Sequence, residues 1–119
     1  MKIALTISEK NENSKVDSRF GRCPYFLIIN DQTGERKIID NTQNLNAMQG
    51  AGIQAAQNLL KENPDVLITG NIGPKAFMLL SEKVKIYTGA GDLSVNEAIE
   101  KFKKGELKQT TVATKPGHW

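Results

Sequence analysis

Three glycine-containing loops each precede a segment with helical periodicity. They are Gly50-Ala51-Gly52, Gly70-Asn71-Ile72-Gly73 and Gly89-Ala90-Gly91. The N-terminus of a helix offers unpaired N–H donors and a partial positive charge, and glycine lets a ligand approach the backbone without meeting a Cβ atom. The chemistry that these residue types predict is the binding of an anion by backbone amides.

A second block adds charged and sulfur-containing side chains. It reads Arg19-Phe20-Gly21-Arg22-Cys23, and Cys23 is the only cysteine in the chain. Guanidinium groups form charge-assisted hydrogen bonds with anions. A single cysteine cannot form an internal disulfide, and a thiol close to Arg22 and to helix N-termini is expected to favour the thiolate, the form that binds metal. We therefore predict that Cys23 is a metal ligand and that the rest of the block belongs to the same binding site.

Each of these features also has an ordinary structural interpretation. A glycine before a helix is often a turn or a cap, and loop arginines are often solvated. Cys23 precedes an apolar strand and could be a buried structural thiol. Asp17, Asp40 and Asp92 could be ligands or could serve as turn and cap residues, and His118 stands next to the last residue without an assigned role. The sequence alone leaves these alternatives open.

The hydrophobic pattern predicts the elements that position these residues. Ile3, Leu5 and Ile7 alternate with smaller side chains, as in a strand. Strands are predicted at residues 2–8, 25–29, 36–40, 66–68 and 84–87. Helices are predicted around residues 53–60, from Pro74 onward, and from a capping box at Ser94 and Glu97 to a stop at Gly105.

The order of these elements fixes where the loops lie. Strand–helix units joined by right-handed crossovers give a parallel set of strands, whereas the second strand is expected to pair antiparallel with the first and to form a hairpin with the third. Counting directions places the three glycine loops and the Arg19–Cys23 block at one edge of the sheet. Open α/β sheets bind ligands outside the carboxyl ends of their parallel strands.

The composition matches a single small globular domain. The chain has 119 residues, of which 39% are hydrophobic and 24% charged, and a formal net charge of +3. We expect one α/β domain over residues 1–105 and a polar C-terminal tail over residues 106–119.

Lysines at 101, 103, 104 and 108 are typical of a solvated helix face, so nucleic acid is not the expected partner. No segment fits a signal peptide or a membrane span, which predicts a cytoplasmic protein without a membrane partner.

The motif blocks, taken together, resemble a known family. They are Phe20-Gly21-Arg22-Cys23-Pro24-Tyr25-Phe26, Gly50-Ala51-Gly52-Ile53-Gln54-Ala55-Ala56, Gly70-Asn71-Ile72-Gly73-Pro74-Lys75-Ala76-Phe77 and Gly89-Ala90-Gly91. From Met1 to about Gly105 the chain is similar to the dinitrogenase iron-molybdenum cofactor biosynthesis family, which includes carrier proteins and cofactor-binding domains of nitrogenase cofactor assembly. The resemblance implies a ribonuclease H-like sheet with strand order 3-2-1-4-5, an antiparallel second strand, and a role in binding or carrying a metallocluster.

The chain departs from the pattern of that family at two points. Many relatives carry a histidine where this chain has Arg19, and another where it has Met48 and Gln49. One thiolate cannot fill the four positions of a typical iron–sulfur or tetrahedral metal site. A cluster that already carries sulfides and an organic acid could be held by one thiolate, backbone donors and arginines, and a dimer could supply two cysteines.

Catalytic chemistry finds little support in the residue types. A nuclease of the ribonuclease H type needs clustered carboxylates to hold two metal ions, and residues 2–8 contain none. Acid–base catalysis needs a positioned histidine or carboxylate pair. We therefore expect no enzymatic activity.

The sequence leads to two hypotheses for function. The first is a non-catalytic carrier of an anionic iron–sulfur or iron-molybdenum type cluster, a monomer or homodimer with cluster donor or acceptor proteins as partners. The second is a binding module for a phosphorylated small molecule or nucleotide, which needs the helix ends and arginines but no metal.

Overall fold

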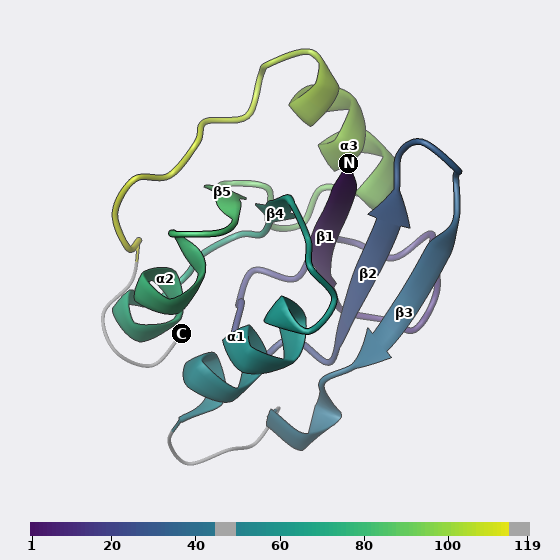
Figure 1. The fold of residues 1–119 in the computed structure, drawn as a ribbon. Helices are drawn as coiled ribbons and strands as arrows, with labels where there is room; N and C mark the ends of the chain where they lie inside the picture. The colour runs from purple at the N-terminus through teal and green to yellow at the C-terminus, as the bar shows by residue number, and fades with distance from the viewer. Residues whose placement is uncertain (45–49, 115–119) are drawn as a thin grey trace.

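A five-stranded mixed sheet forms the centre of the part of the chain that the computed structural model describes, residues 1–44 and 50–114 (Figure 1). The strands are β1 (Lys2–Ile7), β2 (Tyr25–Asn30), β3 (Arg36–Asp40), β4 (Val66–Ile68) and β5 (Lys85–Tyr87). Their order is β3-β2-β1-β4-β5, with β2 antiparallel to β1 and β3, and with β4 parallel to β1 and β5. The strand order and directions expected for a ribonuclease H-like sheet are confirmed.

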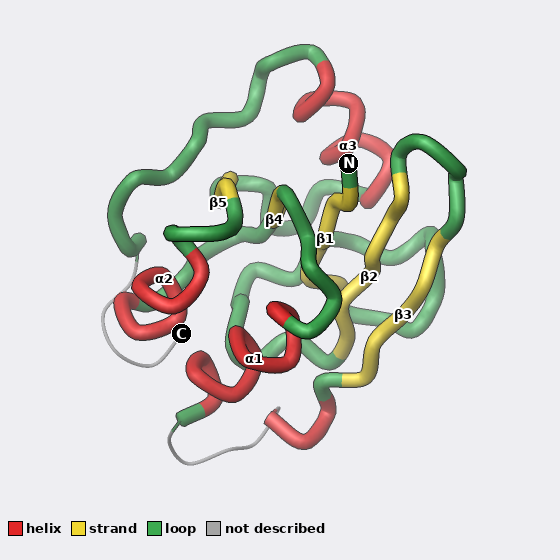
Figure 2. The backbone as a smooth tube through the Cα atoms, viewed as in Figure 1, coloured by secondary structure: helices red, strands yellow, loops and turns green. Residues whose placement is uncertain are grey.

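Helices cover both faces of this sheet. They are α1 (Ala51–Leu60), α2 (Pro74–Leu80) and α3 (Val95–Lys103), and a short 3₁₀ turn, η1 (Thr42–Asn44), follows β3. Figure 2 shows α1 and α2 in front of the sheet, and α3 packs on the opposite face. Within residues 1–44 and 50–114, no helix combines the length and the apolar character needed to cross a membrane.

Alternation along β1 divides the core in two. Ile3, Leu5 and Ile7 lie in the cluster that packs against α3, whereas Ala4 lies in the cluster shared with α1 and α2. Successive side chains of a strand point to opposite faces, so this division follows from the sequence pattern. The predicted strand with one larger face is therefore confirmed.

Local signals set the helix ends as predicted. Pro74 begins α2, and Gly105, with a φ of 73°, follows α3 in the left-handed conformation that glycine tolerates. At the start of α3, Ser94 Oγ accepts from Glu97 N at 3.1 Å, and the Glu97 carboxylate accepts from Ser94 N at 3.3 Å. This reciprocal pair is the capping box that the sequence indicates.

The segment after α3 runs along the outer side of β5 (Figure 1). Gln109 pairs antiparallel with Tyr87, and Thr110 N donates to Ile86 O at 2.7 Å. Further on, Thr114 N donates to Ile72 O at 2.9 Å, and Thr114 Oγ1 accepts from Ile72 N at 2.8 Å. Residues up to Thr114 thus connect the free edge of β5 with the loop that leads into α2.

Candidate functional site

The loop between β1 and β2 crosses the carboxyl edge of the parallel strands and joins the loops that follow β4 and β5. Phe20 N donates to Asn71 O at 3.1 Å, and Asn71 N donates to Ser18 O at 2.8 Å. Val16 N donates in the same way to Leu93 O at 2.8 Å. We call the loops gathered at this edge the rim. The structure thus brings together segments that the direction count had placed at one edge.

Two of the glycines at the rim lie close to the chain's own loop between β1 and β2, and Gly70 is the more tightly packed of the two. A Cβ atom at Gly70 would lie 2.5 Å from Ser18 Cα, and one at Gly91 would lie 3.3 Å from Ser18 Cβ. The space that their missing side chains leave is therefore filled by the loop between β1 and β2. At these positions glycine allows a close approach of backbone to backbone, and that space is not open to a ligand.

The helix N-termini at the rim differ in how far their amides are already used. The start of α3 is capped by its own side chains, and Val95 N donates to Ser14 O at 3.1 Å. The seven-residue α2 begins at Pro74 after Gly73, and Thr114 hydrogen-bonds to Ile72 in the loop before it. By contrast, α1 begins after Gly50, which has a φ of 78°, makes no side-chain cap and has open space where a Cβ would stand. The N-termini of α1 and α2 thus have no side-chain cap, whereas that of α3 has one.

The charge of Arg19 is partly offset by a neighbouring carboxylate. Asp17 is buried, and its Oδ1 accepts from Arg19 N at 2.8 Å and from Arg19 Nε at 3.4 Å. Ser8 Oγ donates to the other carboxylate oxygen at 3.0 Å. The Arg19 side chain is 39% exposed, and Arg22 on the same loop is partly buried. The positive potential expected from two arginines is therefore reduced at Arg19.

Cys23 is fully buried, and its thiol donates to Phe20 O at 3.2 Å. Burial raises the pKa of the Cys23 thiol well above its usual range, and the negative charge of Asp17 adds to this effect. A hydrogen bond from Asn41 and the charge of Arg19 act in the opposite direction but are outweighed. The expectation that the thiolate is favoured is therefore wrong, because loss of hydration exceeds the effect of the nearby cation. Ligation by Cys23 stays a prediction, and it requires the thiol to become exposed.

Two buried asparagines, which the sequence analysis did not single out, hold the cysteine loop in place. Asn41 Nδ2 donates to Cys23 O at 2.8 Å and to Gly21 O at 3.3 Å. Asn44 Nδ2 donates in turn to Asn41 Oδ1 at 2.8 Å, while Asn44 Oδ1 is buried and finds no partner in the described part of the chain. The signal available in the sequence was a pair of asparagines three residues apart directly after a strand. Their bonds fix the loop beside η1, which contacts α1.

A coordination sphere for a bare metal ion is not present among the described residues. Residues 1–44 and 50–114 contain no group of three or more His, Cys, Asp or Glu side chains that could hold a metal ion. Met48, Gln49 and His118, which bear on the missing histidine ligands, lie outside the described residues. What the rim offers is a set of hydrogen-bond donors, from the first turn of α1 and from the arginine loop.

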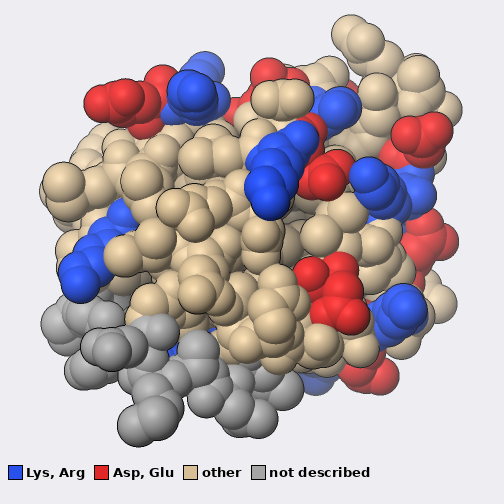
Figure 3. All heavy atoms as spheres, turned by 60° about the horizontal axis from the view of Figure 1, so that its bottom comes forward, with Lys and Arg blue, Asp and Glu red and all other residues tan. Residues whose placement is uncertain are grey.

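The described surface at this edge carries charges of both signs. Figure 3 shows the molecule with the lower edge of Figure 1, where β3 ends and α1 begins, turned toward the reader. Uncharged side chains cover a broad part of the described surface, and basic and acidic side chains lie next to one another along its upper border and right side. Anion binding at the rim would therefore depend on a few directed donors rather than on a broad positive field.

One mixed five-stranded sheet, covered by helices on both faces and with loops gathered at the rim, defines a small protein of the α/β class. Residues 1–105 match the family model described as "Dinitrogenase iron-molybdenum cofactor", so the chain belongs to that family and the resemblance seen in its motif blocks is confirmed. This membership supports a role connected with the biosynthesis of the iron-molybdenum cofactor.

Solved structures and a sequence relative agree with this assignment. The apo form of the orange protein from Desulfovibrio gigas is 34% identical, with a TM-score of 0.91 and 96% of each chain covered. A Thermotoga protein described as a candidate NifB protein is 33% identical, with a TM-score of 0.81 and coverage of 96% of this chain and 97% of the other. The uncharacterized protein MJ0580 of Methanocaldococcus jannaschii is 34% identical over 113 residues, covering 92% of this chain and 91% of the relative.

Proposed function

We propose that this protein is a non-catalytic carrier that binds a preassembled, anionic iron–sulfur or iron-molybdenum type cluster at the rim. The observation that carries the proposal is the uncapped N-terminus of α1 beside the Arg19–Cys23 loop, in a chain that belongs to the iron-molybdenum cofactor family. The names of two relatives are in keeping with it, since one is a candidate NifB protein and the other was solved as an apo form.

The donors at the rim suit a cluster better than a single ion. An α-helix N-terminus carries about half an elementary positive charge and directs its first N–H groups outward, along the helix axis. The first turn of α1, from Ala51 to Ile53, can donate to the sulfides or to the organic acid of a cluster. Arg19 and Arg22 can add charge-assisted hydrogen bonds. A cluster that carries its own bridging ligands needs no complete set of protein ligands, whereas a bare metal ion does.

A binding module for a phosphorylated small molecule or nucleotide is the second candidate. The burial and protonation of Cys23 favour it, because phosphate uses the same amides and guanidinium groups and needs no thiolate. The two candidates therefore differ in their cargo and share a binding site.

Cluster uptake under anaerobic conditions separates them. The purified protein is incubated with ferrous iron and sulfide, or with isolated iron-molybdenum cofactor, and metal content and visible absorption are measured after gel filtration. The carrier proposal expects about one cluster per chain and no turnover. A colourless protein that takes up no cluster but binds ATP or inorganic phosphate would contradict it.

A matched pair of variants on α1 tests the site. Gln54 and Gln57 are both exposed, but Gln54 lies one turn nearer the rim. Gln54→Glu places a negative charge close to the bound anionic cluster and repels it. Charge interactions at a helix end amount to about 0.3–1 kcal/mol, so binding should weaken about two- to fivefold. Gln57→Glu introduces the same charge farther from the rim and should leave the affinity unchanged.

The role of the thiol is tested separately with Cys23→Ala. If backbone amides and arginines hold the cluster, this variant keeps its cluster and its absorption spectrum. If the variant loses the cluster while Gln57→Glu retains it, Cys23 becomes exposed on binding and acts as a ligand.

A further inference from the structure

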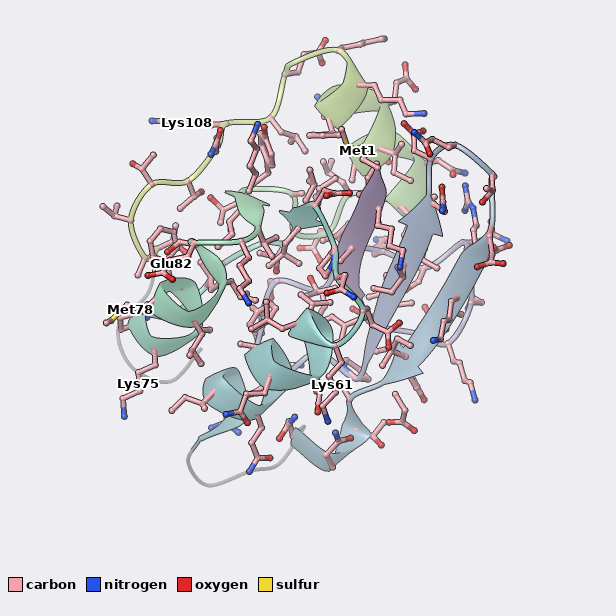
Figure 4. All side chains as sticks on the ribbon, in the orientation of Figure 1. Met1, Lys61, Lys75, Met78, Glu82 and Lys108 are labelled. Atoms are coloured by element: carbon pink, nitrogen blue, oxygen red, sulfur yellow. The ribbon has the colours of Figure 1, made fainter. Side chains whose placement is uncertain are left out.

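The outward face of α2 carries two apolar side chains between opposite charges. Met78 is 73% exposed and Leu79 is 40% exposed. Lys75 and Glu82, both exposed, stand on either side of them in the sequence. Figure 4 shows Lys75, Met78 and Glu82 along the outer side of α2, with Met78 between the two charged residues.

Three of these residues share one face of α2, and Glu82 follows in the turn just beyond its last residue, Leu80. Positions 75, 78 and 79 are three and four residues apart, the spacing at which side chains share a helix face. We call Lys75, Met78, Leu79 and Glu82 together the stripe. Ala76 and Leu80, on the other face of α2, are buried in the core shared with α1. Met78 and Leu79 therefore belong to neither core cluster of residues 1–44 and 50–114.

The two charged residues of the stripe form no ion pair within the described part of the chain. Neither Lys75 nor Glu82 takes part in an ion pair there, although Lys104 and Glu100 on α3 form such a pair at 2.8 Å. The sequence midpoint between Lys75 and Glu82 falls between Met78 and Leu79. A twofold axis through that midpoint would place each lysine opposite the glutamate of an antiparallel copy.

We propose that this stripe is the contact surface for a second copy of the chain, which pairs α2 with the partner's α2 in antiparallel orientation. A twofold interface is self-complementary, so each contact between different residues occurs twice. Lys75 then faces the partner's Glu82 at one end, Glu82 faces the partner's Lys75 at the other, and Met78 and Leu79 lose water at the centre. This proposal does not depend on the carrier function.

The size of α2 limits the strength of the pair. Seven residues of α-helix extend over about 10 Å, so the contact is well below the roughly 800 Å² per partner of a standard interface. We therefore expect a reversible dimer with a Kd of about 0.1–1 mM, which corresponds to about 4–5.5 kcal/mol.

The geometry also determines what the dimer does to the binding site. The N-terminal end of α2 lies at the rim, so an antiparallel pair directs the two rims toward opposite ends of the assembly. Each protomer then keeps its own rim, and the two Cys23 residues are not brought to one cluster. The alternative in which a dimer supplies two cysteines would need a different interface.

Charge exchange at the two ends of the stripe tests the proposal. Sedimentation equilibrium from about 20 µM to 1 mM should show dimer formation by the unaltered chain, weakened by added salt. Lys75→Glu and Glu82→Lys should each shift the chain toward monomer by about tenfold or more in Kd, because like charges then face each other at both ends. The double exchange should restore association, and Lys61→Glu, an exposed charge change on another helix end, should have no effect.

Three results would overturn the proposal. The first is a monomer at 1 mM, and the second is a double exchange that fails to restore association while both single variants remain folded by circular dichroism. The third is dimer formation by a chain that ends at Thr114 but not by the full chain, since this would mean that residues 115–119 of the same chain cover the stripe.

Discussion

The thiol of Cys23 donates a hydrogen bond to a backbone carbonyl and has no access to solvent. At the scale of this residue, two opposed effects act on one proton. A guanidinium and an amide donor favour the thiolate, while burial and a neighbouring carboxylate favour the thiol, and burial is the largest. The polar groups of Asn41 therefore position the loop without activating the sulfur.

Burial of this thiol predicts how stability depends on pH. Because the folded pKa is raised above the unfolded value of about 8.5, the unfolded chain releases the proton first as the pH rises. The stabilisation is therefore fully present below about pH 8.5 and is lost at higher pH, by up to about 1.4 kcal/mol per pH unit. The free energy of unfolding in urea should fall faster for the unaltered chain than for Cys23→Ala between pH 8.5 and 10. A constant difference between the two proteins across that range would contradict the raised pKa.

At the scale of elements, the loop between β1 and β2 acts as a further layer across the rim. Its residues between Ser14 and Phe20 exchange backbone hydrogen bonds with the loops after β4 and β5. This contact is close enough that Ser18 occupies the position of a Gly70 side chain. The loop thus closes off the sheet edge near β4 and β5, and its own Arg19 pairs with Asn71 in the loop after β4.

A pair of glycine substitutions measures how tightly this layer packs. Neither Gly70 nor Gly91 has a positive φ, so alanine at either position tests the space alone. Gly70→Ala would force backbone atoms apart and should lower the free energy of unfolding by about 2–3 kcal/mol. Gly91→Ala makes a less severe contact, 3.3 Å from Ser18 Cβ, which a shift of a few tenths of an ångström relieves, and it should cost about 1 kcal/mol or less. Equal losses for the two variants in denaturant unfolding would show that the loop can move away.

At the scale of the whole molecule, the segment after α3 links parts that are distant in the chain. The family match ends at residue 105, yet Leu107 packs against the core beside α3, and Thr110 and Thr114 hydrogen-bond to β5 and to the loop before α2. The segment therefore protects the edge of β5 and holds one loop of the rim. The division into a domain over residues 1–105 and a tail stays a prediction.

Truncation tests that division. A chain ending at Gly105 should still unfold in one cooperative transition, because both clusters of the core keep most of their members. Loss of the Leu107 contact and of about three backbone hydrogen bonds should lower the free energy of unfolding by about 2–4 kcal/mol. A chain ending at Thr114 retains these contacts and serves as the control. If both truncated chains unfold at the same urea concentration, the segment from 106 to 114 contributes nothing to stability.

The elements, their order and the edge at which the loops gather follow from local patterns in the amino-acid sequence. Alternation in β1, Pro74 at the start of α2 and the pair Ser94 and Glu97 are local signals, and the physics that they express operates within a few residues. Strand directions then follow from chirality and from connection rules, so the rim could be located before any coordinates were known.

What the residues at that rim can do depends on their packing against distant segments. The space at Gly70 is taken by Ser18, the charge of Arg19 is shared with Asp17, and Cys23 is buried and protonated. Each of these outcomes depends on which groups from distant segments exclude water or fill a space, and the residue type does not specify that. The sequence could therefore predict which donors meet at the rim, whereas their accessibility and protonation are set by the packing around them.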